Sequence, residues 1–548
     1  MIKTIAKKPF LLAPMVAVLL MLATAAYAAA PGVTGTNFAI TATPAYISQP
    51  DGQMLYSWGY ACSGGGTAAP TTINAPNACK GTMQIPGPTL IVTEGQTVTV
   101  TLTNNLPTAA GNTSILFPGL NVTTVCPDSA SAGAPQRGLL TCEAVPGSSV
   151  AYSFTPTSPG TRAYYSGTQG DLQVEMGLYG AIIVLPNNNT VLGGCTAAQA
   201  NNASAQAHWG ENDFRLAAAA YDHPKTCYDR EYLFQFSEMD PNIHTQAEAQ
   251  VKIRVGCTAG LPGCSLQVPT EPYHPAYFMI NGRSMPDDMD PNYAVEYPHQ
   301  PYNGNPHMHP GEQVLLRVIG QGRWQHPFHE HGNHVRILGR DVNLILSQND
   351  PNSLAGPLLF TTTTTPGLAM DGIFYFTGKG LNWDMYGHNP ASKDGAAKLP
   401  CTPDAEGYNT LGTSYNAINY YEWCQDHDKP MQVSPFGDVA AGGPMTLPDP
   451  NLFTNGAWYG GSPYLGPNAT LRATGCSSDP RANPSSCGNT GSTPPSGTIA
   501  NSPSDEAGFA FMWHSHNERE ITTNNIFPGG MLMMMLVDSR EFVIDESN

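Results

Sequence analysis

Histidine is concentrated in two short segments, although the 548-residue chain contains only 15 histidines. The segment QHPFHEHGNH holds four of them, and the segment WHSH near the C-terminus holds two more. Side chains two residues apart on a strand point to the same face, so His329 pairs with His331 and His514 pairs with His516. Two such pairs on neighbouring strands would converge four imidazoles, a ligand set suited to copper, zinc or iron. The alternative is that each histidine is an ordinary hydrogen-bonded residue.

Further side chains of the same chemical types lie near these pairs in the sequence. Glu518 and Glu520 follow His516 closely and offer either a carboxylate ligand or a general base, with a solvated acidic turn as the alternative. His307 and His309 form another His-x-His element. We interpret that element either as a weak extra copper-binding element or as a coincidence within a loop.

Short runs rich in valine, isoleucine, threonine and aromatic residues recur along the chain and predict the strands that position these side chains. Residues 89–104 contain two such runs around a Glu-Gly turn, and the second run alternates polar and apolar residues. This alternation is typical of a β-sandwich with one buried and one wet face. The apolar run MLMMML at 531–536 predicts a buried closing strand rather than a methionine-rich copper(I) site.

The predicted strands fall into two groups. We predict an all-β protein with one sandwich over residues 31–190 and a second over residues 228–548, joined by a connector at 191–227. The connector is polar and alanine-rich, with one short helix predicted near 214–221. Residues 380–505 are rich in glycine, proline, serine, asparagine and aspartate, so we predict a disulfide-stapled, loop-rich insertion in the second sandwich.

The composition agrees with a loop-rich β protein and disfavours several classes of function. Charged residues make up 12% of the chain, and it contains 56 glycines and 49 prolines. The formal net charge is −18, without any run of lysine or arginine, so nucleic acid and anionic membrane surfaces are disfavoured as partners. The glycine-rich phosphate-binding motifs and the Gly-x-Ser-x-Gly element of hydrolases are absent from the sequence.

Residues 1–28 have the features of a signal peptide. Three lysines precede an apolar stretch, and the segment ends in Ala-Tyr-Ala, a small-x-small cleavage site. We expect cleavage near Ala29 and export to the periplasm or the extracellular medium, with no membrane span after cleavage. A retained membrane anchor is the alternative, although the apolar run is shorter than the ~20 residues that a spanning helix needs.

The 12 cysteines all follow this segment and occur as neighbouring pairs, which in an exported chain predicts disulfides. The predicted pairs are Cys62–Cys79, Cys126–Cys142, Cys195–Cys227, Cys257–Cys264, Cys401–Cys424 and Cys476–Cys487. Because no Cys-x-x-Cys occurs, structural zinc and redox-active dithiols are weaker interpretations.

The histidine segments resemble motifs of multicopper oxidases. HPFHEHG at 326–332 is similar to the His-Pro-x-His-x-His-Gly element of that family, and WHSH followed by GGM at 529–531 is similar to its terminal His-Cys-His element. IPGPTLIV at 85–92 and GLYGAIIV at 177–184 resemble the early and closing strands of its first domain. The resemblance covers both sandwiches, and it implies two cupredoxin-like Greek-key β-sandwich domains with copper as the metal.

The chain departs from the family at many copper-binding positions. Ser515 stands where the thiolate of a blue type 1 site is expected, and Glu520 stands where its second histidine is expected, so only His326 of that set remains. In the first sandwich, LFPG at 116–119 replaces the family's His-Trp-His-Gly, and YYSG at 164–167 replaces its Tyr-His-Ser-His. Four of the eight histidines of a trinuclear cluster are therefore missing, and we expect the two tyrosines to fill the vacated volume.

The resemblance implies an exported copper-dependent oxidoreductase with a reduced metal set. The expected metal ligands are His326, His329, His331, His514 and His516, and the expected catalytic acid–base residue is Glu520. Electrons would not enter through a blue centre, so an electron donor must reach the site directly or through a partner.

A second hypothesis is a non-catalytic copper-binding or structural cupredoxin protein of the cell envelope. The missing ligands favour it, whereas the two matching His-x-His pairs argue against complete decay of the site. A zinc hydrolase is disfavoured, because four protein ligands close a tetrahedral zinc site and leave no position for water. Assembly into a homo-oligomer is compatible with either hypothesis.

Overall fold

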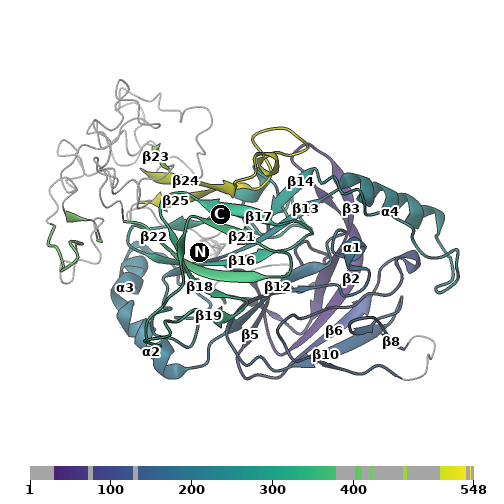
Figure 1. Ribbon diagram of the computed structural model, residues 1–548, viewed down its shortest axis with the longest axis horizontal. Coiled ribbons are helices and arrows are strands. Elements are labelled where there is room, and N and C mark those ends of the chain that lie inside the picture. Colours follow the sequence, from purple (N-terminus) through teal and green to yellow (C-terminus); the bar gives the residue numbers. More distant parts are fainter. Residues whose placement is uncertain are drawn as a thin grey trace, which may run out of the picture.

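The computed structural model describes residues 30–71, 78–127, 134–377, 401–409, 420–421, 423–424, 461–465, 507–538 and 544. Strands dominate these residues and helices are few (Figure 1). The predicted all-β fold of two cupredoxin-like sandwiches is confirmed. The predicted signal peptide and most of the predicted insertion at 380–505 lie outside the described residues.

The first sandwich consists of two five-stranded sheets. Its inner sheet has the order β11-β12-β5-β1-β4, and its outer sheet has the order β3-β2-β6-β10-β7. The strands are β1 Gly32–Thr34, β2 Asn37–Ser48, β3 Met54–Gly64, β4 Thr67–Ala69, β5 Leu90–Thr93, β6 Val98–Asn104, β7 Thr123–Thr124, β10 Ser149–Phe154, β11 Gly160–Tyr165 and β12 Tyr179–Leu185. A separate two-stranded ribbon is formed by β8 Gln136–Arg137 and β9 Cys142–Glu143.

The alternation predicted for the second run of residues 89–104 is realised in β6. Along β6, VTVTLTN, the valines and the leucine are buried and the threonines are half-buried. Val98, Val100 and Leu102 therefore enter the core between the two sheets, where they join Trp58 and Tyr152. A period of two residues places every second side chain on the same face, which is why this pattern was readable from the sequence.

The second sandwich consists of a seven-stranded inner sheet and a six-stranded outer sheet. The inner sheet has the order β14-β13-β16-β22-β18-β19 with β20 paired to β18, and the outer sheet has the order β15-β25-β24-β17-β21 with β23 paired to β24. The strands are β13 Arg230–Met239, β14 Tyr277–Ile280, β15 His307–Met308, β16 Gln313–Gly320, β17 His326–Glu330, β18 Val335–Arg340, β19 Asn343–Leu344, β20 Leu358–Leu359, β21 Thr361–Thr364, β22 Ala369–Tyr375, β23 Gly461–Leu465, β24 Ala507–Ser515 and β25 Leu532–Asp538.

The two sandwiches pack inner sheet against inner sheet. Ile183 on β12 shares a hydrophobic cluster with Leu233 on β13 and Ile319 on β16. Thr161 on β11 donates from its backbone N–H and from its hydroxyl to the carboxylate of Asp371 on β22, at 3.1 and 2.6 Å. The four sheets are therefore stacked as layers, and the outer sheet of the second sandwich lies farthest from the first sandwich. In Figure 1 this sheet, with β17, β24 and β25, lies at the top, above the strands of the first sandwich.

The closing strand β25 behaves as its sequence predicts. Met531, just before the strand, and Met533 and Met535 within it are fully buried in the core of the second sandwich. They pack there with Trp513 and Phe328. The methionines are core residues, and the prediction of a buried strand at 531–536 is confirmed.

Helices occur between β11 and β12, between β12 and β13, and after β13. They are α1 Gly170–Gln173, α2 Asn189–Ala198, α3 Ala200–Trp209 and α4 Pro241–Ile253. Asn188 caps α2 by accepting from two backbone N–H groups, and Asp240 caps α4, which begins with a proline. The helix predicted near 214–221 is wrong, because that segment is irregular and the helices precede it.

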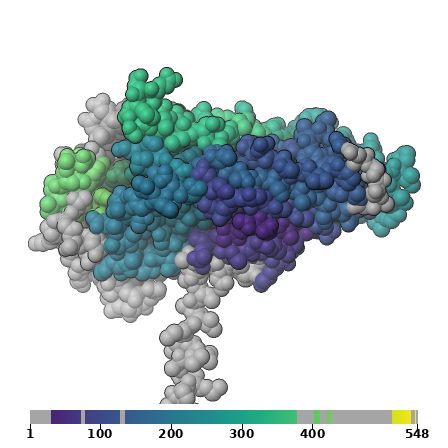
Figure 2. Space-filling model, turned by 90° about the horizontal axis from the view of Figure 1, so that it is seen from below, coloured from purple at the N-terminus to yellow at the C-terminus, as the bar shows by residue number. Residues whose placement is uncertain are grey.

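Helices α2 and α3 lie at one end of the molecule, near β18 and β19, and α4 lies toward the other end, beside β3 (Figure 1). Seen from below, the purple and blue residues of the first sandwich form much of the surface (Figure 2). Within the described part of the chain, no helix has both the length and the apolar character that crossing a bilayer requires.

Disulfides connect neighbouring segments as predicted from the cysteine pairs. The bridges are Cys62–Cys79, Cys126–Cys142, Cys195–Cys227, Cys257–Cys264 and Cys401–Cys424. These five predictions are confirmed, and the remaining pair, Cys476 and Cys487, lies outside the described residues. None of the described cysteines is free.

Candidate metal centre

Two adjacent strands of the outer sheet carry the four clustered histidines. Strand β17 pairs antiparallel with β24, and this register places His329 directly opposite His514. His331 and His516 each follow the end of their strand. The neighbouring Phe328 and Trp513 point the other way, into the core of the second sandwich. Because side chains alternate along a strand, the four imidazoles lie on the face of the sheet that is turned away from the core.

The four rings are in mutual contact. The ring centroid of His329 lies 4.8 Å from that of His331, 5.5 Å from that of His514 and 4.7 Å from that of His516. One nitrogen from each of His329, His331 and His514 lies within 4.8 Å of the others. The Nε2 atoms of His331 and His514 are 3.3 Å apart. Two nitrogens bound to one tetrahedral metal at about 2.0–2.1 Å would be separated by roughly 3.3–3.4 Å.

Hydrogen bonds to the second ring nitrogen orient two of these imidazoles. Nδ1 of His514 lies 2.7 Å from the backbone carbonyl oxygen of Ser515, so it carries the proton and leaves the lone pair on Nε2. Nδ1 of His329 lies 2.6 Å from the hydroxyl of Thr361 on β21. Such partners fix the tautomer and the ring orientation of metal-binding histidines.

The protonation state of the cluster also suits metal binding. Burial, together with the neighbouring His331, His514 and His516, lowers the pKa of His329 to about 4. Burial lowers the pKa of His514 as well. Both imidazoles are therefore neutral near pH 7, and neutral imidazole is the form that binds a metal.

One side of the cluster is covered and the other is open. His329 is buried, His331 and His514 are half-buried, and His516 is exposed. The ring of Phe360 lies 5.8 Å from that of His329 and 41% of this phenylalanine is exposed. Neither Phe360 nor Thr361 was identified from the sequence, since a strand of threonines carries no metal-binding signature. A donor molecule would reach the site from the side of His516.

The donor set fits copper. The cluster offers imidazole nitrogens without a thiolate, a combination that binds copper without the blue type 1 chromophore. His329, His331 and His514 would hold the ion, and His516 is close enough to His329 to join them after a small ring movement.

His326, Ser515 and Glu520 also come together, but on the inner face of the same strands. Nδ1 of His326 lies 2.9 Å from Oε2 of Glu520, and its Nε2 lies 2.8 Å from Oε2 of Glu238 on β13. The hydroxyl of Ser515 donates to the same oxygen of Glu520, and the amide of Asn517 donates to the other oxygen at 2.9 Å. The side chains of His326, Ser515, Glu238 and Glu520 are all buried.

This arrangement holds a proton rather than a metal. Burial alone would lower the pKa of His326, but its hydrogen bonds to Glu238 and Glu520 outweigh burial and raise the pKa to about 9. The ring is therefore an imidazolium with both nitrogens protonated near pH 7. A protonated nitrogen has no lone pair for copper.

Two predicted roles are corrected by these contacts. His326 is not carried into the proposed ligand set, because carboxylates occupy both of its nitrogens. Glu520 is not carried forward as a general base, because its two oxygens accept hydrogen bonds in the interior from His326, Ser515 and Asn517. The sequence did not reveal Glu238, which lies 88 residues before His326 and belongs to no motif.

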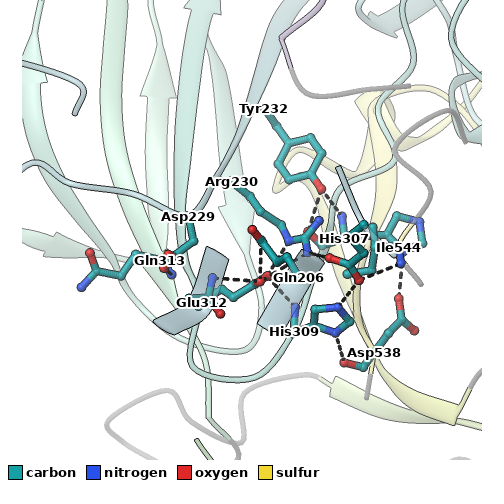
Figure 3. A network of polar contacts seen from close by, with 12 residues as sticks. Gln206, Asp229, Arg230, Tyr232, His307, His309, Glu312, Gln313, Asp538 and Ile544 are labelled. Atoms are coloured by element: carbon teal, nitrogen blue, oxygen red, sulfur yellow. Dashed lines mark hydrogen bonds and ion pairs between the residues drawn. The ribbon is translucent and has the colours of Figure 1, made fainter. Parts of the chain in front are cut away.

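The His307-Met308-His309 element lies in a separate polar network (Figure 3). Nδ1 of His307 lies 2.9 Å from the carboxylate of Asp538, and Nδ1 of His309 lies 2.8 Å from its carbonyl oxygen. Nε2 of His309 contacts Glu211, which also pairs with Arg230. Burial opposes the ionisation of Glu211, but His309 and Arg230 hold its pKa near 2. The network ties strand β25 to the connector and to the inner sheet, so we interpret it as structural.

In the first sandwich, the positions where the resemblance expects histidines have other contacts. The backbone N–H of Leu116 donates to the carbonyl oxygen of Tyr165 at 2.7 Å, so the two segments LFPG and YYSG do lie side by side. The Tyr164 hydroxyl is buried and donates to the carbonyl oxygen of Pro88 at 2.7 Å. Tyr164 therefore packs in the core, whereas Tyr165 is half-buried.

Comparisons with known proteins agree with the resemblance. Residues 69–189 match the model of the multicopper oxidase family. This match confirms the predicted resemblance over most of the first sandwich, and the family that it names implies copper as the metal. No curated protein matches the sequence of the chain.

Solved structures similar to this chain include copper proteins from Nitrosomonas europaea. A blue copper oxidase shares 14% identity, with 91% of this chain and 85% of that chain covered and a TM-score of 0.41. A copper nitrite reductase shares 18% identity, with 62% of this chain and 84% of that chain covered and a TM-score of 0.35. The multicopper oxidase mgLAC shares 14% identity, with 91% and 85% covered and a TM-score of 0.41.

Proposed function

We propose that this protein is an exported copper-binding oxidoreductase whose copper is held by His329, His331, His514 and His516 on the outer sheet of the second sandwich. The observation that carries the proposal is the 3.3 Å separation of the Nε2 atoms of His331 and His514 within a cluster of four imidazoles. Two imidazole nitrogens at this distance either share one proton or flank a bound cation, and the cluster of further imidazoles around them supports the second arrangement.

The chain's own residues orient and shield the site. Thr361 and the backbone carbonyl of Ser515 hold two rings by their Nδ1 atoms. The ring of Phe360 lies against His329 and covers part of that side of the cluster. Copper held by these residues would supply one-electron redox chemistry. The exposed ring of His516 marks the side from which an electron donor approaches.

The route of electrons in this proposal differs from one through a thiolate copper. The inner position beside Ser515 is filled by the His326–Glu520 ion pair, so the donor has to reach the outer face itself. The same observation favours the second candidate function, a non-catalytic copper-binding protein. Steady turnover of an electron donor by the copper-loaded protein would separate the two, because a binding protein accepts at most the electrons its metal can hold.

The test of the site is metal content measured after copper loading and dialysis, with an electron paramagnetic resonance spectrum of the same sample. We expect about one copper per chain and a non-blue signal from imidazole ligands. His329→Ala and His514→Ala should each remove the tightly held copper, whereas the matched control His274→Ala, at an exposed histidine of another segment, should retain it. Unchanged stoichiometry in the first two variants would refute the assignment.

Export is tested separately from the metal. The proposal rests on residues 1–28, with their lysines, apolar stretch and small-x-small site. N-terminal sequencing of protein recovered from the periplasm or the medium should show that the mature chain begins near Ala29. Recovery of the full chain from the cytosol alone would contradict export.

A further inference from the structure

A cavity of about 760 Å³ lies between the two sandwiches, apart from the histidine cluster. The first sandwich supplies most of its wall, and the second supplies residues near Leu266, Gln321 and Pro366. Pockets that bind small organic molecules typically measure ~300–1,000 Å³ and often lie between domains. None of the four clustered histidines lines this cavity, so it is a second site, independent of the proposed copper centre.

The wall is largely apolar. Leu116, Leu139, Leu140, Val174 and Leu266 all line the cavity. Leu139 is 94% exposed and Leu140 is 65% exposed. Two adjacent leucines facing solvent at the edge of a concave apolar surface are an unfavourable arrangement for the empty protein, and they gain burial when an apolar molecule enters.

Three residues that line the cavity stand at positions where the resemblance expects copper ligands. Leu116 stands at the first histidine position of the family's His-Trp-His-Gly element, and Tyr165 and Gly167 stand at the two histidine positions of its Tyr-His-Ser-His element. All three residues line the cavity. Where the family motifs have three imidazoles, this chain has an aliphatic side chain, a phenol ring and a glycine without a side chain.

Among the described residues that line the cavity, one carboxylate is the only charged group. Glu143 lines the cavity, and no lysine, arginine or histidine does. Its Oε1 accepts from the hydroxyl of Thr168 at 2.9 Å and its Oε2 accepts from the amide of Asn112 at 3.1 Å. Neutral donors hold the carboxylate in place and leave its charge uncompensated by the wall. The Tyr165 hydroxyl, which has no hydrogen-bond partner among the described residues, adds one more polar group.

We propose that this cavity binds a largely apolar organic amine, with its ammonium group at the carboxylate of Glu143 and its apolar body against the leucines. An organic anion would meet the charge of Glu143 without any compensating cation, and a chain of net charge −18 would repel it at longer range. A neutral apolar molecule would gain the apolar contacts but not the charge-assisted hydrogen bond that an amine makes.

The test uses three probes of one shape: 1-naphthylmethylamine, 1-naphthalenemethanol and 1-naphthoate. Their binding to the full chain is measured by isothermal titration calorimetry at low ionic strength and neutral pH. We expect the amine to bind at least about tenfold more tightly than the alcohol, and the naphthoate to bind more weakly still. Equal affinities for the amine and the naphthoate, or for the amine and the alcohol, would overturn the proposal.

Two variants place the binding at this cavity. Glu143→Gln removes the charge and should reduce affinity for the amine about tenfold while leaving that for the alcohol nearly unchanged. The control Glu296→Gln makes the same change in charge at an exposed loop residue outside the cavity and should have no effect. Amine binding that is equal in the wild type and in Glu143→Gln would contradict the role of the carboxylate.

Gly170→Trp tests the space itself. Gly170 lines the cavity, and a β-carbon at this position meets no heavy atom within 4 Å, so a side chain can begin here without displacing a neighbour. We expect it to weaken binding of the amine and the alcohol alike. Undiminished binding of the amine and the alcohol would show that the probes bind elsewhere. This variant also tests the proposal if Glu143→Gln does not fold. Amine affinity should be the same in His329→Ala, which separates this site from the copper centre.

Discussion

The two faces of the β17–β24 pair carry different chemistry, although they are built from neighbouring residues. The outer face holds neutral imidazoles in contact with one another, at a distance suited to a shared metal. The inner face holds an imidazolium, His326, between the carboxylates of Glu238 and Glu520. On the outer face the proposed partner of the imidazoles is a cation that the chain itself does not supply. On the inner face the chain supplies both charges, and the site is complete without one.

The comparison teaches that positions where the resemblance expects copper ligands can be occupied in two ways. In the first sandwich, Leu116, Tyr165 and Gly167 stand there and line a cavity. On the inner face of the second sandwich, Ser515 stands at the expected thiolate position and joins a buried ion-pair network. The ion-pair network is part of the packed interior. Substitutions on the inner face should therefore change the free energy of unfolding, and substitutions on the outer face should change the copper content.

The largest expected effect is on copper. The double variant His329→Ala/His514→Ala should lower the copper content from about one per chain to none, while the free energy of unfolding of the metal-free protein changes less than in the inner-face variants, because neither ring belongs to the hydrophobic core and His514 is only half-buried. Elemental analysis and urea unfolding of the same samples check both parts. A double variant that keeps its copper, or that unfolds, would remove the distinction between the two faces.

Glu520→Ala should have the largest effect on stability. It leaves the buried charge of His326 with one partner and removes the acceptor of Ser515, so we expect a loss of about 3–5 kcal/mol. Urea denaturation of the metal-free protein measures this change. Glu518→Ala, at an exposed position two residues earlier, is the matched control and should change stability by less than about 0.5 kcal/mol. Comparable effects in the two variants would show that the network contributes nothing specific.

The inner face should also make stability depend on pH. The folded-state pKa of His326 is about 9, above its ordinary value of 6.5, so the folded protein holds this proton more tightly than the unfolded chain does. Its contribution, roughly 3 kcal/mol at most, is complete below pH 6.5 and is lost as the pH rises through 9.

The measurement is the difference in free energy of unfolding between the wild type and His326→Gln, at pH 6, 7.5 and 9.5. The difference should shrink from the lowest to the highest pH. A difference that grows toward high pH would mean that His326 is neutral in the fold and that the assignment of the ion pair is wrong.

The smallest expected effect comes from Ser515→Ala. The variant removes one hydrogen bond to a carboxylate and should cost about 1–3 kcal/mol. Copper content should not change, even though Ser515 lies between two proposed ligands in the sequence, because its side chain is on the other face of the strand. Loss of copper in this variant would show that the two faces are not independent.

Several features could be predicted from the sequence because they depend on short-range periodicity. The period of two residues along a strand places His329 with His331 and His514 with His516, and it predicted the alternation of β6 and the burial of β25. Five predicted disulfides were readable because each joins neighbouring cysteines in the chain. The helices α2 and α3 were missed, because an alanine-rich connector without a strong apolar face resembles a loop.

The sequence by itself determined which side chains are available and which of them share a face of a strand. Only the tertiary structure decided what those faces meet. Glu238 reaches His326 across 88 residues because β13 and β17 belong to opposing sheets of one sandwich, and no local pattern encodes that contact. The same stacking of sheets turned four histidines outward as a candidate metal site and enclosed His326 and Glu520 as an ion pair. A buried charge that lacks water is costly unless it is paired, so the partner that the fold supplies determines the role of each group.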